Sequence, residues 1–409
     1  MRATRLALVL VATTVLAACG GSGPTADTSA ADPTPSPPVG PTTSSPPVTS
    51  APPTSTAPTT APATTPPADR ASQVLATLDL REQAGQLVMT GLRFGRDRGP
   101  TFDALQRAAI GNVFLGGRST AGVDEVADLT AQLQASAPAG VPLLIATDQE
   151  GGQVQVLSGP GFDTMPSGLD QGDRDAADLQ TDATRWGRQL AAAGVRVNLG
   201  PVLDTVPRGA DNPPIGGYDR EYGHDPSTVT SHGGAFAAGL AAAGVAAAGK
   251  HFPGLGRVDA NTDTTAGVTD TVTTAGDPYL QPFAHAIDAG IAMIMISSAV
   301  YTRIDATQQA CFSPAVISRL LRTELGFGGV VVTDDVGNAT AVTGVPVGDR
   351  ATRFVDAGGD LVLDVAPNQA PDLAAALVAK AQAEPAFAQK VRAAALRVLR
   401  LKASLGLLG

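Results

Sequence analysis

Eight short apolar runs recur between residues 86 and 365. They are Gln86–Leu92, Gly111–Gly117, Pro142–Asp148, Val195–Asp204, Val245–Phe252, Ile291–Val300, Gly329–Asp335 and Asp360–Val365. Most of them are continuously apolar rather than alternating. This is typical of strands that are covered on both faces, as in parallel sheets.

Segments with helical spacing separate most of the runs. They start at Asp124, Asp182, Ser227, Leu280, Ser313, Pro371 and Gln389, and several end in glycine, which tolerates the left-handed conformation of a helix C-terminus. Ser313 before Pro314 fits a cap residue followed by a first-turn proline. Eight strands alternating with helices predict a single α/β domain, a (β/α)8 barrel, with a long loop near Gly200–Pro226. An open doubly wound sheet is the alternative, but no Gly-x-Gly-x-x-Gly turn follows any run.

The first residues have the layout of a bacterial secretory signal. Residues 1–18 contain two arginines, the apolar run Leu6–Ala18 and small residues before a cysteine. The run is shorter than the roughly 20 apolar residues of a membrane helix. The ending Leu16-Ala17-Ala18-Cys19 resembles a lipobox, so Cys19 is the expected lipidation site. An ordinary cleaved signal with a chance cysteine is the alternative.

Residues 19–68 are rich in proline, threonine and serine, and they bury too little apolar surface to fold. We expect an extended tether between the lipid and a folded domain at residues 69–409. The protein is therefore predicted to be an exported lipoprotein, anchored on the outer face of the bacterial cell membrane. With Cys19 lipidated, Cys311 has no intramolecular disulfide partner.

The net charge is −10, and no basic cluster is present. This balance argues against nucleic acid as a partner, and it leaves the lipid as the expected contact with the membrane. No His-x-x-x-His or Cys-x-x-Cys pattern occurs, so neither a metal site nor a cofactor is predicted. A monomer is expected.

Polar residues end three of the apolar runs. Asp148 ends the run Pro142–Asp148, Lys250 and His251 lie near the end of the fifth run, and Asp334 lies near the end of the seventh. In a barrel these positions share the C-terminal rim, where barrel enzymes place their sites. Asp334 also fits a helix cap, Asp148 a turn, and Arg220 a surface ion pair. Lys250 is harder to explain in this way, because a lysine near the end of a buried strand needs an anion or acceptor.

Three stretches carry a resemblance to a known family: ATDQEGGQVQ, GKHFPGLG and LLRTELGFGGVVVTDDVGN. They resemble glycoside hydrolase family 3, specifically its single-domain β-N-acetylglucosaminidases, also called β-N-acetylhexosaminidases. The resemblance implies that Asp334 is the nucleophile, and that Asp148, Arg220, Lys250 and His251 hold the hydroxyls of the sugar. It also implies retaining hydrolysis of terminal β-linked N-acetylglucosamine, with a carbohydrate partner drawn from peptidoglycan or its fragments.

The chain departs from the family pattern at the acid/base. The family has a histidine at the position of Leu255 and an Asp-Ser-His at residues 261–263, where this chain reads Asn-Thr-Asp; the last histidine is the family's acid/base. Gln153 and Val156 replace two arginines.

Three hypotheses follow from this departure. Asp263 is the acid/base, since a carboxyl with a raised pKa suits that role. Alternatively, Asp263 is a turn residue of a catalytically silent glycan-binding protein. As a third option, Asp259 or Glu150 supplies the proton. A β-glucosidase-like specificity also stays open.

Overall fold

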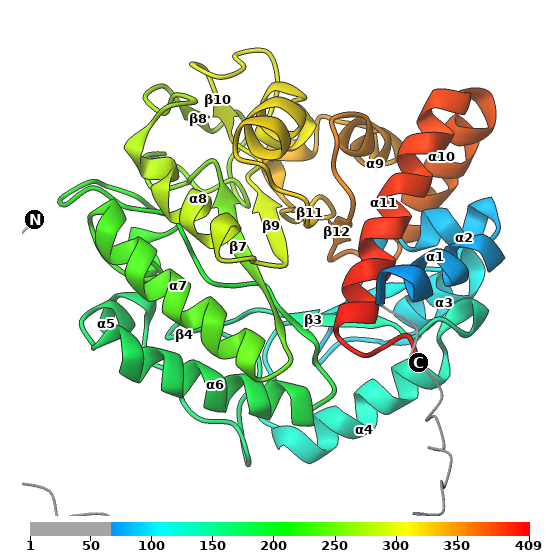
Figure 1. Cartoon of the computed structure of the whole chain (residues 1–409), viewed down its shortest axis with the longest axis horizontal. Coiled ribbons are helices and arrows are strands. Elements are labelled where there is room, and N and C mark those ends of the chain that lie inside the picture. Colours follow the sequence, from blue (N-terminus) through cyan, green and yellow to red (C-terminus); the bar gives the residue numbers. More distant parts are fainter. Residues whose placement is uncertain (1–66) are drawn as a thin grey trace, which may run out of the picture. The chain divides into compact units, whose positions relative to one another are not determined.

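The structure is a computed structural model that describes residues 67–409. Within this range eight parallel strands form one sheet that follows the chain order (Figure 1). The strands are β1 (Val88–Arg93), β2 (Asn112–Gly116), β3 (Leu144–Thr147), β6 (Val197–Asn198), β7 (Ala246–Phe252), β9 (Met293–Ile296), β11 (Val330–Thr333) and β12 (Val362–Asp364). Seven of the predicted runs contain one of these strands in full, and the run Gln86–Leu92 contains all of β1 except Arg93.

The sheet closes on itself at two seams. β1 pairs with β12 in the register Val88↔Val362, and a bridge from Val332 to Leu361 joins β11 to the residue before β12. The first strand therefore meets the last one, and the predicted (β/α)8 barrel is confirmed. The alternative of an open doubly wound sheet is wrong.

The strands separate two apolar layers. Met89, Leu144, Met293 and Leu363 belong to a cluster inside the barrel, whereas neighbours such as Val88 and Ile145 belong to the larger cluster shared with the helices. Both faces of each strand are thus covered. This explains why the strands read as continuous apolar runs, because neither face needs polar side chains for contact with water.

Helices surround the barrel (Figure 1). They are α1 (Pro67–Thr77), α2 (Leu80–Gly85), α3 (Gly99–Ala108), α4 (Gly122–Ala135), α5 (Gly168–Gly172), α6 (Ala176–Ala192), α7 (Pro226–Ala242), α8 (Gln281–Asp288), α9 (Val347–Asp356), α10 (Ala370–Ala383) and α11 (Pro385–Ser404). None of the helices within residues 67–409 is both long and apolar enough to cross a membrane. The predicted signal (1–18), Cys19 and the linker (19–68) lie outside the described residues, except that Pro67 and Ala68 begin α1.

The segment predicted from Ser313 is a π-helix, η5 (Ala315–Glu324), rather than an α-helix. Its amides bond five residues back, as from Arg319 to Pro314 and from Leu325 to Leu320. Ser313 caps its start, since its hydroxyl accepts from the Val316 amide at 3.2 Å. The sequence pattern did not distinguish this helix type, because apolar spacing constrains the buried face and not the hydrogen-bond register.

The last helix closes the N-terminal end of the barrel. Val398 and Leu401 of α11 belong to the inner apolar cluster, and Lys402 is fully buried there. The Lys402 ammonium donates to Gln86 Oε1 at 2.7 Å and to the Gly111 carbonyl at 2.9 Å. The rim at the opposite end is therefore the open end of the barrel.

Short elements decorate that rim. The hairpin of β4 (Gln149–Gly151) and β5 (Val154–Gln155) follows β3, and a second pair joins β8 (Thr269–Asp270) to β10 (Val300–Tyr301). The predicted long loop spans residues 199–225 between β6 and α7, and it contains the 3-10 turn η2 (Gly216–Tyr218). Further 3-10 turns are η1 (Pro138–Gly140), η3 (Pro278–Leu280), η4 (Ala310–Phe312) and η6 (Thr340–Val342).

A buried carboxyl at the end of β12 makes the free energy of unfolding depend on pH. Asp364 is fully buried; its Oδ1 accepts from the Ala366 amide, and its Oδ2 has no hydrogen-bond partner among the described residues. Burial raises the pKa of Asp364 from 3.8 to about 7. The folded state holds the Asp364 proton more tightly than the unfolded state does. Its contribution to the free energy of unfolding is therefore fully present below pH 3.8 and is lost as the pH rises through about 7, where the buried carboxyl must ionise at a cost in stability.

We expect Asp364→Asn to remove the cost of ionising this buried carboxyl at high pH. The variant should be more stable than the wild type by roughly 1–4 kcal/mol at pH 8 and equally stable at pH 4. Urea unfolding at both pH values measures the difference. The exposed Asp124→Asn serves as the control and should change the free energy of unfolding by under about 0.5 kcal/mol. A pH-independent effect of Asp364→Asn would contradict the prediction.

Candidate active site

The ends of the strands bring the predicted residues to one cavity at the rim. Asp148 follows β3, Lys250 and His251 belong to the end of β7, and Asp334 follows β11. The cavity has a volume of about 440 Å³, and Asp148, Arg220, Lys250, His251, Asp263 and Asp334 are all among its lining residues. The structure therefore gathers all six predicted site residues that lie within residues 67–409.

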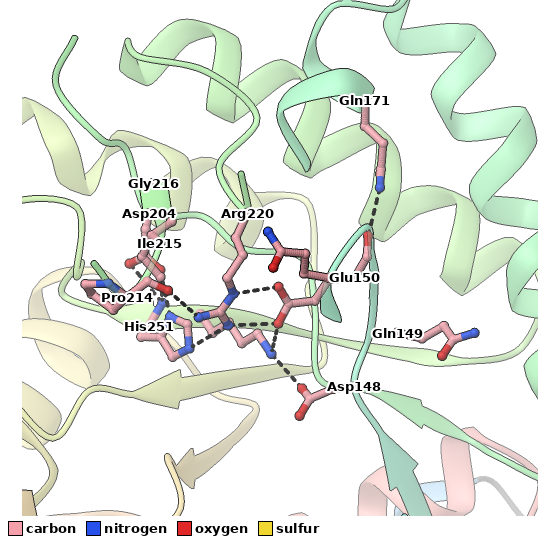
Figure 2. A network of polar contacts seen from close by, with 12 residues as sticks. Asp148, Gln149, Glu150, Gln171, Asp204, Pro214, Ile215, Gly216, Arg220 and His251 are labelled. Atoms are coloured by element: carbon pink, nitrogen blue, oxygen red, sulfur yellow. Dashed lines mark hydrogen bonds and ion pairs between the residues drawn. The ribbon is translucent and has the colours of Figure 1, made fainter. Parts of the chain in front are cut away.

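A buried ion network forms one wall of this cavity (Figure 2). The Lys250 ammonium lies 2.7 Å from Asp148 Oδ1 and 2.5 Å from Glu150 Oε1. Arg220 binds the same Glu150 carboxylate through two parallel bonds, of 2.8 Å from Nε and 2.9 Å from Nη2. Lys250 is only 2% exposed, so the anions that the sequence led us to expect for it are present.

Glu150 is held in its charged form. Burial alone would raise its pKa, but Arg220 and Lys250 outweigh burial and lower the pKa to about 2. A carboxyl that stays ionised at neutral pH is a poor proton donor. Asp259 is exposed and lines neither this cavity nor the one beside it. The hypothesis that Glu150 or Asp259 supplies the proton therefore fits the structure poorly.

Asp334 faces the cavity from the end of β11. Its backbone amide bonds to the Ile296 carbonyl, and its Oδ1 accepts from the Asp335 amide at 2.9 Å. Burial is the main cause that raises the pKa of Asp334. His251 opposes this rise, and the Asp263 carboxylate adds to it. The two carboxyls are thus close enough to influence each other's ionisation.

Asp263 lies at the mouth of the cavity and is exposed to solvent. Its loop is attached by its backbone to the segment after β11, since Thr340 donates to the Asp263 carbonyl and Ala341 to the Thr262 carbonyl, both at 3.0 Å. Partial desolvation is the main cause that raises the pKa of Asp263; His251 lowers it, and Asp335 raises it further. A raised pKa keeps a carboxyl protonated to higher pH, as an acid catalyst requires.

Comparison with known proteins identifies the family. Residues 79–401 match the Glycosyl hydrolase family 3 N terminal domain. The chain belongs to glycoside hydrolase family 3. It is 34% identical over 322 residues to a protein named Beta-hexosaminidase from Xanthomonas campestris pv. campestris (strain B100), covering 75% of this chain and 87% of that one.

Solved structures agree with this assignment. The chain resembles a β-N-acetylhexosaminidase from Beutenbergia cavernae DSM 12333 with a TM-score of 0.78 and 54% identity, over 79% of this chain and 98% of that one. It also resembles a family 3 β-N-acetylglucosaminidase from Paenibacillus sp. str. FPU-7, with a TM-score of 0.74 and 30% identity, over 81% of this chain and 63% of that one. The chain is therefore a glycoside hydrolase of family 3.

Two residues of this family 3 site were not predicted in the role that the structure gives them. Glu150 was predicted only as an alternative proton donor, whereas it is the shared counter-ion of Lys250 and Arg220. Asp204, whose Oδ2 lies 2.7 Å from His251 Nδ1, was not predicted as a site residue. Asp204 ends the run Val195–Asp204 as Asp148 ends its own run, and this shared position was the available signal. Within residues 67–409 no group of three or more His, Cys, Asp or Glu side chains could hold a metal ion.

The Glu150 network should contribute strongly to stability. Glu150→Ala leaves the buried Lys250 and the partly buried Arg220 without their shared anion, and we expect it to lower the free energy of unfolding by roughly 3–5 kcal/mol. Asp356→Ala is a matched control, because it removes the shared anion of Lys380 and Lys390 at the surface. It should cost under about 1 kcal/mol in urea unfolding. Equal losses in the two variants would show that the buried network does not hold the rim.

Proposed function

We propose that the chain is a retaining β-N-acetylhexosaminidase that releases terminal β-linked N-acetylglucosamine. The observation that carries the proposal is that the carboxyls Asp334 and Asp263 line the same cavity as the cations Lys250 and Arg220, and that each carboxyl has a raised pKa, mainly through desolvation. The relatives named Beta-hexosaminidase and the β-N-acetylhexosaminidase structure support the choice of sugar.

The proposed reaction has two steps. The Asp334 carboxylate attacks the anomeric carbon and forms a glycosyl ester, while the Asp263 carboxyl gives its proton to the leaving oxygen. Asp263, now ionised, then takes a proton from a water molecule that attacks the anomeric carbon and releases Asp334. Lys250, Arg220, His251 and Asp148 are proposed to hold the hydroxyls of the sugar, because charged donors and acceptors make the strongest hydrogen bonds.

The two carboxyls give a direct test. Asp334→Asn should abolish hydrolysis of a β-1,4-linked N-acetylglucosamine disaccharide and of an aryl N-acetylglucosaminide. Asp263→Asn should slow the disaccharide by about a hundred- to ten-thousandfold. It should slow the aryl substrate much less, because that leaving group departs without a proton. Asp259→Asn, outside the cavity, is the control and should retain activity on both substrates.

The pH profile adds a second signature to the same experiment. As the pH rises through the raised pKa of Asp263, hydrolysis of the disaccharide should fall because the acid loses its proton. A wild type that binds N-acetylglucosamine without cleaving either substrate would instead favour the alternative, a catalytically silent glycan-binding protein. Preference for a β-glucoside would favour the β-glucosidase-like alternative.

A second cavity beside the first supports peptidoglycan as the source of the substrate. It has a volume of about 640 Å³ and shares Arg93, Asp148, Gln153 and Tyr218 with the first among its lining residues. Within residues 67–409 no hydrogen bond or ion pair engages the Arg93 guanidinium, and Tyr218 is 42% exposed. A free cation beside an exposed aromatic ring suits an aglycone sugar that carries a carboxylate, as muramic acid does.

Arg93→Gln tests this part of the proposal. The variant should lower kcat/KM roughly threefold to tenfold for N-acetylglucosaminyl-muramic acid, because an exposed charge pair is worth on the order of 1 kcal/mol. It should leave the neutral N-acetylglucosamine disaccharide unchanged. Arg96→Gln, exposed in the turn just after Arg93 but outside both cavities, is the matched control. Equal effects of Arg93→Gln on both substrates would refute a role in charge recognition.

The proposed place of action is the outer face of the bacterial cell membrane. The lipobox-like Leu16–Cys19 and the proline-rich linker of residues 19–68 support this location. A lipid at Cys19 and an extended tether would hold the barrel near the cell wall, where peptidoglycan lies. The cleaved, unlipidated protein remains the alternative.

A further inference from the structure

A fully buried carboxylate, Asp204, joins two parts of the site. Its Oδ2 accepts from His251 Nδ1 at 2.7 Å, and its Oδ1 accepts from the His251 backbone amide at 3.1 Å. The same Oδ1 also accepts from the Leu255 amide at 2.6 Å. Figure 2 shows Asp204 and Arg220 on either side of the His251 ring.

The contact at Nδ1 determines how His251 faces the cavity. A carboxylate only accepts hydrogen bonds, so the proton of a neutral His251 lies on Nδ1 and Nε2 is left unprotonated. Arg220 Nη2 lies 3.5 Å from this Nε2 and is a donor. Both neighbours therefore favour the same tautomer, in which Nε2 accepts hydrogen bonds in the cavity.

The contact at Leu255 determines where the acid loop begins. Leu255 is buried, and Asn212 Nδ2 donates to the Leu255 and Val258 carbonyls at 2.8 and 2.9 Å. Tyr301 donates to the Gly254 carbonyl at 2.8 Å. The loop that leads to Asp263 thus starts from a fixed point, and Asp204 is the residue that ties this point to His251.

We propose that Asp204 is a positioning residue that fixes the tautomer of His251 and the start of the Asp263 loop together. Its kinetic consequence rests on the proposed hydrolysis, whereas its effect on His251 does not. No lysine or arginine forms an ion pair with Asp204 among the described residues, although a buried charge is costly. An asparagine oxygen would serve the two backbone amides equally well. The second oxygen, Oδ2, accepts from the imidazole N–H at 2.7 Å and lies 3.2 Å from the His251 amide. Both contacts of Oδ2 are thus with His251, which explains why this residue carries a second acceptor oxygen.

Asp204→Asn tests the proposal in the full chain. The asparagine would keep one oxygen for the backbone amides and turn its N–H₂ toward His251 Nδ1, which favours the Nε2–H tautomer. Imidazole ¹⁵N NMR reports the tautomer directly, and the chain has only four histidines to assign. We expect Nδ1–H in the wild type and Nε2–H in the variant. Since Nε2–H then faces Arg220, binding of N-acetylglucosamine should weaken, and kcat/KM should fall on the order of ten- to a hundredfold.

The matched control is Asp270→Asn. Asp270 is also buried and accepts from two backbone amides, Val272 and Thr273, but it does not contact His251. A merely structural role would lower Tm in both variants and leave the His251 tautomer unchanged in both. That result overturns the proposal, and so does an Nε2–H tautomer in the wild type. The wild-type tautomer can be measured even if Asp204→Asn does not fold.

The experiment separates this proposal from the proposed function. If the wild type hydrolyses nothing, the hydrolase proposal fails, while the tautomer and the binding of N-acetylglucosamine still decide the role of Asp204. If the wild type hydrolyses the disaccharide and Asp204→Asn keeps both the tautomer and kcat/KM, the positioning role alone is refuted.

Discussion

The shared carboxylate of Glu150 is the interaction on which the open end of the barrel depends. It lies between Lys250 at the end of β7 and Arg220 in the loop before α7. Without Glu150, Lys250 would keep only Asp148 as an ion-pair partner, and Arg220 would have none among the described residues. Lys250 is buried because β7 is covered on both faces, so its charge cannot reach bulk water. A charge in that position must be paired or neutralised. The pairing fixes the β4 hairpin, β7 and the Arg220 loop relative to one another.

The segment from Leu255 to Asp263, where this chain departs from the family pattern, is held by hydrogen bonds near both of its ends. Leu255, which replaces a polar histidine, is buried, and its backbone is held by Asn212 and Asp204. The loop is attached again near Asp263 by the amides of Thr340 and Ala341. A carboxylate is shorter than an imidazole, so a proton donor of this kind needs a loop that approaches the nucleophile closely. Backbone bonds at both ends hold this loop in place, and the proposed role of Asp263 depends on that placement.

Charge is distributed unevenly over the two cavities. In the first cavity the cations Lys250 and Arg220 are paired with the carboxylates of Asp148 and Glu150, and the acids Asp334 and Asp263 carry the proposed chemistry. Arg93 lines both cavities and has no anionic partner among the described residues. In the proposed function the paired groups hold the neutral sugar, and the unpaired Arg93 meets the acidic aglycone.

The sequence by itself determined the barrel and the placement of most site residues. Continuous apolar runs predicted all eight strands, because a strand buried on both faces leaves no other pattern. Polar residues at their ends then predicted Asp148, Lys250, His251 and Asp334 at one rim, which the structure shows. Arg220 and Asp263 were placed through the family resemblance, since neither lies at the end of a run.

Only the tertiary structure determined which charged side chains pair with one another. Glu150 meets Lys250 and Arg220 from positions 100 and 70 residues away, and Asp204, in the loop after β6, meets His251 of the neighbouring strand β7. The π-helical register of η5 and the attachment of the Asp263 loop to η6 likewise became known only from the tertiary structure. Spacing along a chain specifies periodicity and burial. It does not specify which charged groups share a buried space, because that depends on how the loops between the strands pack.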